Sequence, residues 1–183
     1  MKILTSFYIV ALLFVGCSSS AQDPVQAHAE ITALEDSISK ASLKLVQGEK
    51  MDTLMINRLK SKLVNFYQTF PENEYAPEYL DKLHMLAIGQ RDYETGMRYA
   101  DTLIKNYKDY INRPMILESM ANAYDMFIQP RDISKVKQYN NMLLKENPKM
   151  DKEKREEIEF RMKHIDLTID QLIDLQIESL EEN

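Results

Sequence analysis

Apolar residues recur at helical spacing along most of the chain, and prolines divide the pattern into segments. Between residues 27 and 45 the apolar positions alternate at intervals of four and three, which predicts a helix with a narrow, coiled-coil-like seam. A second apolar face covers residues 55–70, and Pro71 ends it because proline lacks the amide hydrogen that a helix interior requires. These segments predict a first helix pair at about 25–70, in which Gly48 ends the first helix.

Two further helix pairs follow at a similar period. Pro77 and Pro114 each stand where the first turn of a helix tolerates proline. Each is followed by a run with an apolar face, a short polar connection and a second such run, and Pro148 closes the last of them. The pattern therefore predicts pairs at about 76–107 and 113–147.

A long final helix is predicted at about 151–180, with an apolar side that carries Ile158, Ile165 and Leu172. Its opposite side has acidic residues at intervals of four, namely Asp166, Asp170, Asp174, Glu178 and Glu182. Like charges at this spacing destabilise an isolated helix by roughly 0.2–0.5 kcal/mol per pair, so the apolar side must pack on the preceding pair. We interpret the acidic side as the solvated outer face of a capping helix.

Composition agrees with one all-α domain at residues 25–183. The 183-residue chain is 44% hydrophobic and 28% charged, which is typical of a folded protein. Four glycines and six prolines leave little material for the many turns of a β-protein. The formal net charge of −6 argues against a nucleic-acid partner.

The N-terminus has the pattern of a targeting segment. Lys2 precedes nine apolar residues at 7–15, which is fewer than the roughly 20 needed to cross a bilayer. Gly16 and then Cys17, the only cysteine, follow, and the whole resembles a bacterial lipoprotein signal. We therefore expect 1–16 to be a signal peptide, Cys17 to carry lipid and 17–24 to be a flexible tether to the outer membrane. We expect the protein to face the periplasm, and a surface-exposed orientation is the alternative. A secretory signal with an incidental cysteine is the alternative.

Several phrases resemble the tetratricopeptide repeat. Asp92-Tyr93 is similar to the Asp-Tyr that joins the two helices of that repeat, and residues 120–124, Met-Ala-Asn-Ala-Tyr, resemble a run in its first helix. The period of about 38 residues is slightly longer than the family's ~34. His84 stands where the family has a small residue. The resemblance implies antiparallel helix pairs stacked as a short right-handed superhelix, about three pairs with a long C-terminal capping helix.

A narrower resemblance covers residues 55–148. The phrase from Phe66 to Glu78, followed by Asp-Tyr and by residues 103–107, resembles the BamD lipoproteins of outer-membrane β-barrel assembly and the Tol-Pal-associated periplasmic repeat proteins. This likeness implies a non-catalytic interaction scaffold in outer-membrane protein assembly or envelope maintenance.

By the same resemblance, the first helices of the pairs line a concave groove for a partner. The groove residues are expected to be Glu78, Asp81, Met85, Ile88, Met115, Glu118, Asn122, Asp125 and Met126. Acidic groups beside adaptable methionines predict an envelope protein that presents a basic and apolar segment. If so, charge reversal of Glu118 and Asp125 should release the partner. The alternative is that these positions are solvated helix faces and internal packing.

Catalytic and metal-binding patterns are missing from the sequence. His28, His84 and His164 fall on different predicted helices, without a histidine or cysteine at metal-ligand spacing, and we interpret them as surface or packing residues. So few glycines cannot build a phosphate-binding loop. We expect no enzyme activity, metal or cofactor. Two other functions remain open: a structural spacer or homo-oligomer that pairs through residues 27–45, and a cell-wall-remodelling hydrolase, which would need a cluster of catalytic residues.

Overall fold

The computed structural model describes residues 23–45 and 53–181, and these ranges form eight α-helices and one π-helical turn without a strand. This confirms the predicted all-α class. The elements are α1 (Pro24–Leu45), α2 (Thr53–Thr69), α3 (Ala76–Gly89), α4 (Tyr93–Asn106), α5 (Arg113–Asn122), η1 (Ala123–Phe127), α6 (Ile133–Glu146), α7 (Lys152–Lys163) and α8 (Ile169–Glu181).

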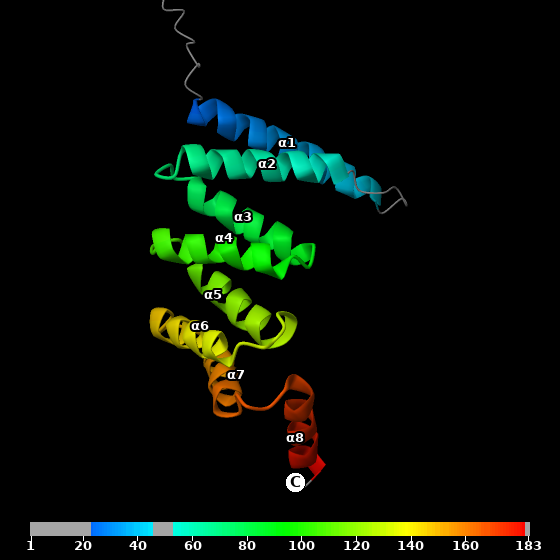
Figure 1. Cartoon of the computed structure of the whole chain (residues 1–183), viewed down its shortest axis with the longest axis vertical. Helices are drawn as coiled ribbons and strands as arrows, with labels where there is room; N and C mark the ends of the chain where they lie inside the picture. Colours follow the sequence, from blue (N-terminus) through cyan, green and yellow to red (C-terminus); the bar gives the residue numbers. More distant parts are fainter. Residues whose placement is uncertain (1–22, 46–52, 182–183) are drawn as a thin grey trace, which may run out of the picture.

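The helices are stacked in chain order along the long axis of the molecule (Figure 1). Within the described residues, every extensive interface joins elements that are neighbours in the sequence. The stack therefore places α1 and α8 at opposite ends (Figure 1).

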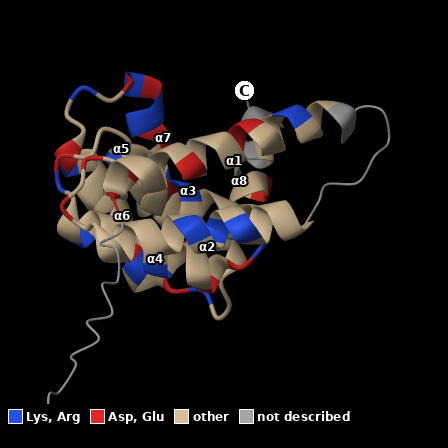
Figure 2. Ribbon diagram, turned by 90° about the horizontal axis from the view of Figure 1, so that it is seen from above, with Lys and Arg blue, Asp and Glu red and all other residues tan. Residues whose placement is uncertain are grey.

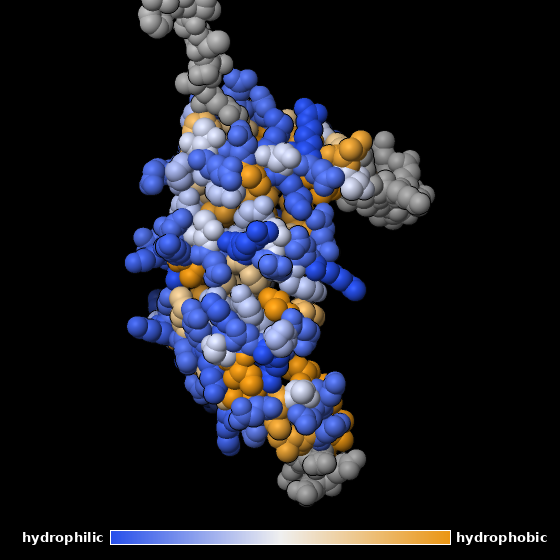
Figure 3. Space-filling model, in the orientation of Figure 1, coloured by the Kyte–Doolittle hydropathy of each residue, from blue (hydrophilic) through white to orange (hydrophobic). Residues whose placement is uncertain are grey.

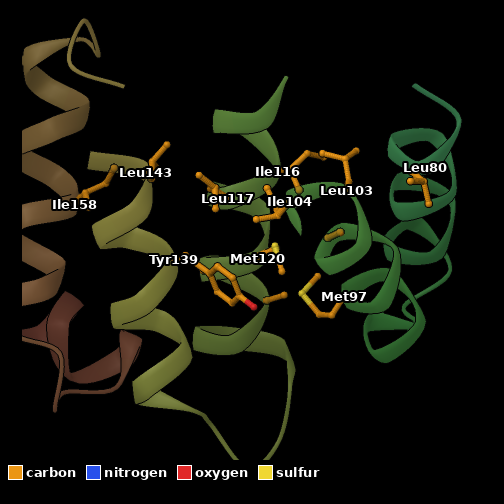
Figure 4. Packing of buried hydrophobic residues seen from close by; sticks show 13 residues of the cluster. Leu80, Met97, Leu103, Ile104, Ile116, Leu117, Met120, Tyr139, Leu143 and Ile158 are labelled. Carbon is orange, nitrogen blue, oxygen red and sulfur yellow. The ribbon is translucent and has the colours of Figure 1, made fainter. Parts of the chain in front are cut away.

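The apolar faces pack into two adjoining clusters. In the first, the seam of α1 is buried through Ala27 and Ile31 against Leu63 and Phe66 of α2 and Leu83 of α3. The second cluster runs from α3 to α7, and Figure 4 shows its side chains pointing toward one another between the helices. Burial of each large apolar side chain contributes about 1.5–3 kcal/mol. Because α2 and α3 already cover the start of the α1 seam, that part of the seam is not available to a second copy.

Aspartates cap the N-terminal ends of three of the helices. The Asp92 carboxylate accepts a hydrogen bond from the backbone of Thr95 (3.2 Å), and Asp132 accepts one from Lys135 (3.1 Å). Asp151 caps α7 in the same way. Such caps contribute about 0.5–2 kcal/mol each. Asn112 precedes α5 but makes no side-chain cap; its amide bonds to α3 instead.

A buried arginine joins α4, α5 and α6. Arg113 at the start of α5 donates hydrogen bonds to both carboxylate oxygens of Glu146 on α6, at 2.5 and 3.1 Å. Its third nitrogen donates to the backbone carbonyl of Ile104 at 2.6 Å. The guanidinium group thus satisfies the end of α4 and fixes the following helix pair on it.

The single long final helix predicted at 151–180 is wrong, because the chain leaves the helical path between α7 and α8. Arg131 donates a hydrogen bond to the carbonyl of Ile165 (2.7 Å), and Arg131 and Arg161 both donate to that of Leu167 (3.2 and 3.0 Å). Thr168 and Gln171 then bond reciprocally to each other's backbone amide, which is a capping box that starts α8.

The break also divides the predicted acidic stripe. Asp166 lies in the connection, whereas Asp170 and Asp174 are exposed on α8. The side chains of Glu178 and Glu182 lie outside the described residues. Figure 3 shows apolar surface over the C-terminal helices, where Ile173 and Ile177 of α8 are about half exposed.

Candidate partner-binding groove

Eight of the nine predicted groove residues line two adjoining hollows, of about 730 and 490 Å³. The two hollows share Asp81, Met85 and Asn112 and therefore form one continuous groove. We call the part beside α1 and the start of α3 the acidic end, lined by Glu35, Glu74, Glu78, Asp81 and Lys82. We call the part beside α5 and η1 the methionine end, lined by Met85, Ile88, Tyr93, Met115, Met126 and Phe127.

The acidic end has an excess of negative charge. Lys82 lies 2.8 Å from a carboxylate oxygen of Glu35 and 2.9 Å from one of Glu78. Burial by itself lowers the pKa of Lys82, but the hydrogen bonds and charges of these two carboxylates outweigh it and raise the pKa. Glu74 and Asp81 take part in no ion pair among the described residues, so four carboxylates face one ammonium group.

Two hydrogen-bond donors without charge hold Asp81 at the junction of the two hollows. Its Oδ2 atom accepts from the Tyr110 hydroxyl at 2.9 Å and from the Asn112 amide at 3.3 Å. Burial raises the pKa of Tyr110 and the Asp81 carboxylate raises it further, so the phenol keeps its proton and remains a donor. Among the described residues, no donor bonds to the other oxygen of Asp81, Oδ1.

Exposed methionine and aromatic side chains form the methionine end. Met85 and Met115 are 58% and 67% exposed, and Phe127 is 50% exposed. The Phe127 ring stacks on Tyr93, with centroids 5.0 Å apart and planes 6° from parallel. Flexible methionines beside a fixed aromatic pair provide an apolar surface that adapts to a ligand's shape.

His84 forms part of the floor and joins three helices. It is fully buried, with Nδ1 3.0 Å from the Gly96 carbonyl of α4 and Nε2 2.9 Å from the Ser119 hydroxyl of α5. A carbonyl only accepts, so Nδ1 carries the proton and Ser119 donates to Nε2. Burial lowers the pKa of His84, which favours this neutral form. The structure thus places His84 in packing, one of the two roles considered from the sequence.

Glu118 and Asn122 lie at the methionine end on the α5 side. Lys154 of α7 is 2.8 Å from the Glu118 carboxylate and 3.1 Å from that of Glu157, so it compensates part of the charge of each. The sequence pattern gave residues 152–163 only a capping role, so it did not predict that Lys154 pairs with Glu118.

Asp125 does not line the groove, contrary to expectation. It is only 9% exposed and accepts hydrogen bonds from Arg131 Nε (2.6 Å) and from Arg161 Nε and Nη2 (2.7 and 2.8 Å). The reason is the π-helical turn η1, in which Ile128 N bonds to the Ala123 carbonyl five residues earlier. This wider turn breaks the 3.6-residue register on which the prediction depended. Charge reversal of Asp125 would test the fold rather than the groove.

Burial and salt bridges act in opposite directions on the Asp125 carboxyl. Burial by itself raises its pKa, but the hydrogen bonds and charges of Arg161 and Arg131 prevail and hold the pKa below its usual range. Asp125 is therefore a carboxylate that connects η1 to the junction of α7 and α8.

Sequence reasoning missed several groove residues that come from other elements. Glu35 reaches the acidic end from α1, and Tyr93 reaches the methionine end from the start of α4. Ile111 is 86% exposed in the turn before α5 and borders the acidic end. Only Ile111 carried a local signal, since it is a large apolar residue in an otherwise polar turn.

Basic side chains are concentrated elsewhere. Figure 2 shows blue segments along α2, which carries Arg58, Lys60 and Lys62 and no acidic residue. Lys60 and Lys62 bond to Gln90 and Glu30, outside both hollows. The acidic groove thus has no lysine-rich or arginine-rich counterpart within its own walls.

Within the described ranges, no group of three or more His, Cys, Asp or Glu residues is arranged to hold a metal ion. In the same ranges, no helix combines the length and apolar character needed to cross a membrane. Cys17, the predicted signal segment 1–16, most of the predicted tether 17–24 and Gly48 lie outside the described residues. Comparison of the chain with protein-family models, curated proteins and solved structures finds no match.

Proposed function

We propose that this protein is a non-enzymatic interaction scaffold of the bacterial cell envelope that binds another protein in the groove between α3, α5 and η1. The observation that carries the proposal is the continuity of the two hollows, which join exposed methionines to Glu74 and Asp81, two carboxylates without a cation partner among the described residues. Such a surface suits a basic and apolar segment. A soluble protein rarely exposes apolar side chains together without a binding role.

The stacked pairs α1–α2, α3–α4 and α5–α6 support a tetratricopeptide-like right-handed superhelix as the architecture, with α7 and α8 as its C-terminal cap. In this architecture each repeat contacts its neighbours, and the first helices form the concave side. The interfaces between sequence neighbours and the groove on α3 and α5 fit that arrangement. The proposed cellular role is outer-membrane protein assembly or envelope maintenance, with the chain lipid-anchored at Cys17 and facing the periplasm.

Site-directed photo-crosslinking in intact cells tests the scaffold function. A photoreactive phenylalanine analogue at Met115, in the groove, should crosslink to a specific envelope protein. The matched control is the same analogue at Gln138, which is exposed on α6 and lines neither hollow. Identical products at both positions, or none at Met115, would refute the proposal.

The alternative of a homo-oligomer that pairs through residues 27–45 has lost support, because Ala27 and Ile31 of that seam are buried within the same chain. We therefore expect light scattering after size exclusion to give the mass of a monomer. A dimer would favour the alternative of a structural spacer or homo-oligomer.

A further inference from the structure

The two ends of the groove differ in charge. At the acidic end, Lys82 compensates part of the charge of Glu35 and Glu78, while Glu74 and Asp81 have no cation partner among the described residues. At the methionine end the carboxylate is Glu118, and it pairs with Lys154, which also pairs with Glu157 of α7. A ligand along the groove thus meets carboxylates without a cation partner among the described residues at the acidic end, and a carboxylate with a shared cation partner at the methionine end.

Asp81 offers a defined contact at the junction. Tyr110 and Asn112 both bond to Oδ2, which fixes the carboxylate plane and leaves Oδ1 as an acceptor without a donor among the described residues. A lysine or arginine of a ligand would complete the hydrogen bonding of this oxygen and compensate the charge. Asp81 lines both hollows, so that cation would lie directly beside the apolar contacts.

The methionine end provides the apolar contacts. Met115, Met126 and Phe127 are all substantially exposed, and His84 and Ser119 beneath them satisfy each other. A leucine, methionine or phenylalanine of a ligand would therefore meet an apolar surface without leaving these floor groups unpaired.

We propose that the groove binds a partner segment in one direction only, with a lysine or arginine at Asp81 and Glu74 and a large apolar residue between Met115, Met126 and Phe127. This inference rests on the proposed scaffold function and adds the chemistry and the polarity of the ligand. The partner is another protein rather than a second copy, because a chain of net charge −6 is repelled by its own acidic groove.

Selection from a random 12-residue peptide display library tests the inference, with the full chain carrying Cys17→Ser as the immobilised target. We expect enriched peptides to place basic residues on one constant side of an apolar anchor. A synthetic copy of an enriched peptide, in both block orders and in an interleaved order of equal composition, is then titrated by fluorescence anisotropy. The selected order should bind at least about tenfold more tightly than the other two.

Two variants locate the ends of the ligand. Asp81→Asn should weaken the selected peptide by about tenfold and reduce the salt dependence of binding, while Met115→Glu should remove the apolar preference. Glu94→Gln, at an exposed position of α4 outside both hollows, is the matched control and should bind as the parent does. If Asp81→Asn alters the circular dichroism spectrum, Glu74→Gln provides the same test from an exposed position.

Equal binding of all block orders, or binding unaffected by both Asp81→Asn and Glu74→Gln, would overturn the inference. Self-association of the chain that Asp81→Asn abolishes would also overturn it, by making a second copy the occupant. If Met115 crosslinks to an envelope protein but the library yields no ligand, the scaffold function stands and this inference fails. If the library yields a directional ligand but no cellular crosslink forms, the scaffold function fails instead.

Discussion

Replacement of Asp125 by asparagine should loosen the C-terminal end of the stack. The carboxylate accepts three hydrogen bonds of 2.6–2.8 Å from Arg131 and Arg161, whose side chains are only 17% and 13% exposed. Asparagine has nearly the same shape but leaves both guanidinium groups without a counter-charge among the described residues. Removing one partner of a buried ion pair costs about 3–5 kcal/mol, and the remaining amide oxygen favours the lower limit.

Thermal unfolding followed by circular dichroism measures this loss. A loss of about 3 kcal/mol in a chain of this size should lower the melting temperature by about 6–12 °C. Hydrogen exchange should accelerate first in α7, α8 and their connection, because both arginines also donate to backbone carbonyls there. Asp166→Asn removes an exposed carboxylate from the same connection and should change stability by less than about 0.5 kcal/mol.

The pH dependence gives the same reasoning a second test. Arg161 and Arg131 lower the pKa of Asp125 in the folded state against the opposing effect of burial. The carboxylate therefore stabilises the fold above the unfolded-state pKa of about 3.9, and this stabilisation is lost as the pH falls through the folded-state pKa. The Asp125→Asn variant should show a shallower decline of stability with acid. An Asp125→Asn variant with the melting temperature of the parent, or with the same loss of stability in acid, would refute the role of Asp125.

Three further predictions concern the anchor and the groove. Cys17→Ser should move the protein from the membrane fraction to the soluble fraction, and retention in the membrane would contradict lipid attachment. Because burial lowers the pKa of His84, its contribution to stability should be full above about pH 6.5 and be lost as the pH falls through the folded-state pKa. Urea unfolding at several pH values should show a smaller pH dependence of stability in His84→Asn, and an unchanged pH dependence would contradict this role of His84. A Cβ on Gly96 would lie 2.8 Å from the Cδ1 atom of Ile88, so Gly96→Ala should push Ile88 toward the groove. Peptide binding should therefore weaken. The melting temperature should change little, because the helix-propensity gain of about 1 kcal/mol offsets the crowding. Unchanged binding would contradict the displacement of Ile88.

The end of α2 and the starts of α3 to α6 could be anticipated because their signals are local. Apolar periodicity, the prolines at 71, 77 and 114, and the capping aspartates Asp92 and Asp132 act within a few residues of each boundary. The register of α3 and α5 follows from the same periodicity. The groove positions on those two helices were implied by the resemblance to the tetratricopeptide repeat, and they line the two hollows in the structure.

The remaining features depend on contacts between distant segments or on a change of helix type. No local sequence signal predicts that Ala123–Phe127 forms a π-helical turn, and this turn rotates Asp125 into the interior. Glu35 and Tyr93 enter the groove only through tertiary packing. The break before α8 is different, because Thr168-x-x-Gln171 is a capping-box sequence that could have been recognised.

The stacking order has a mechanical consequence. Because α1 and α8 lie at opposite ends and the interfaces join sequence neighbours, a pull between the two ends of the stack loads those interfaces in series (Figure 1). The first to separate would be the weakest, while the Arg113 clamp would keep α4, α5 and α6 together as a block. A ligand seated across α3 and α5 would carry load in parallel with the α3–α4 and α4–α5 interfaces, so occupancy of the groove would raise the force at which the middle of the molecule yields.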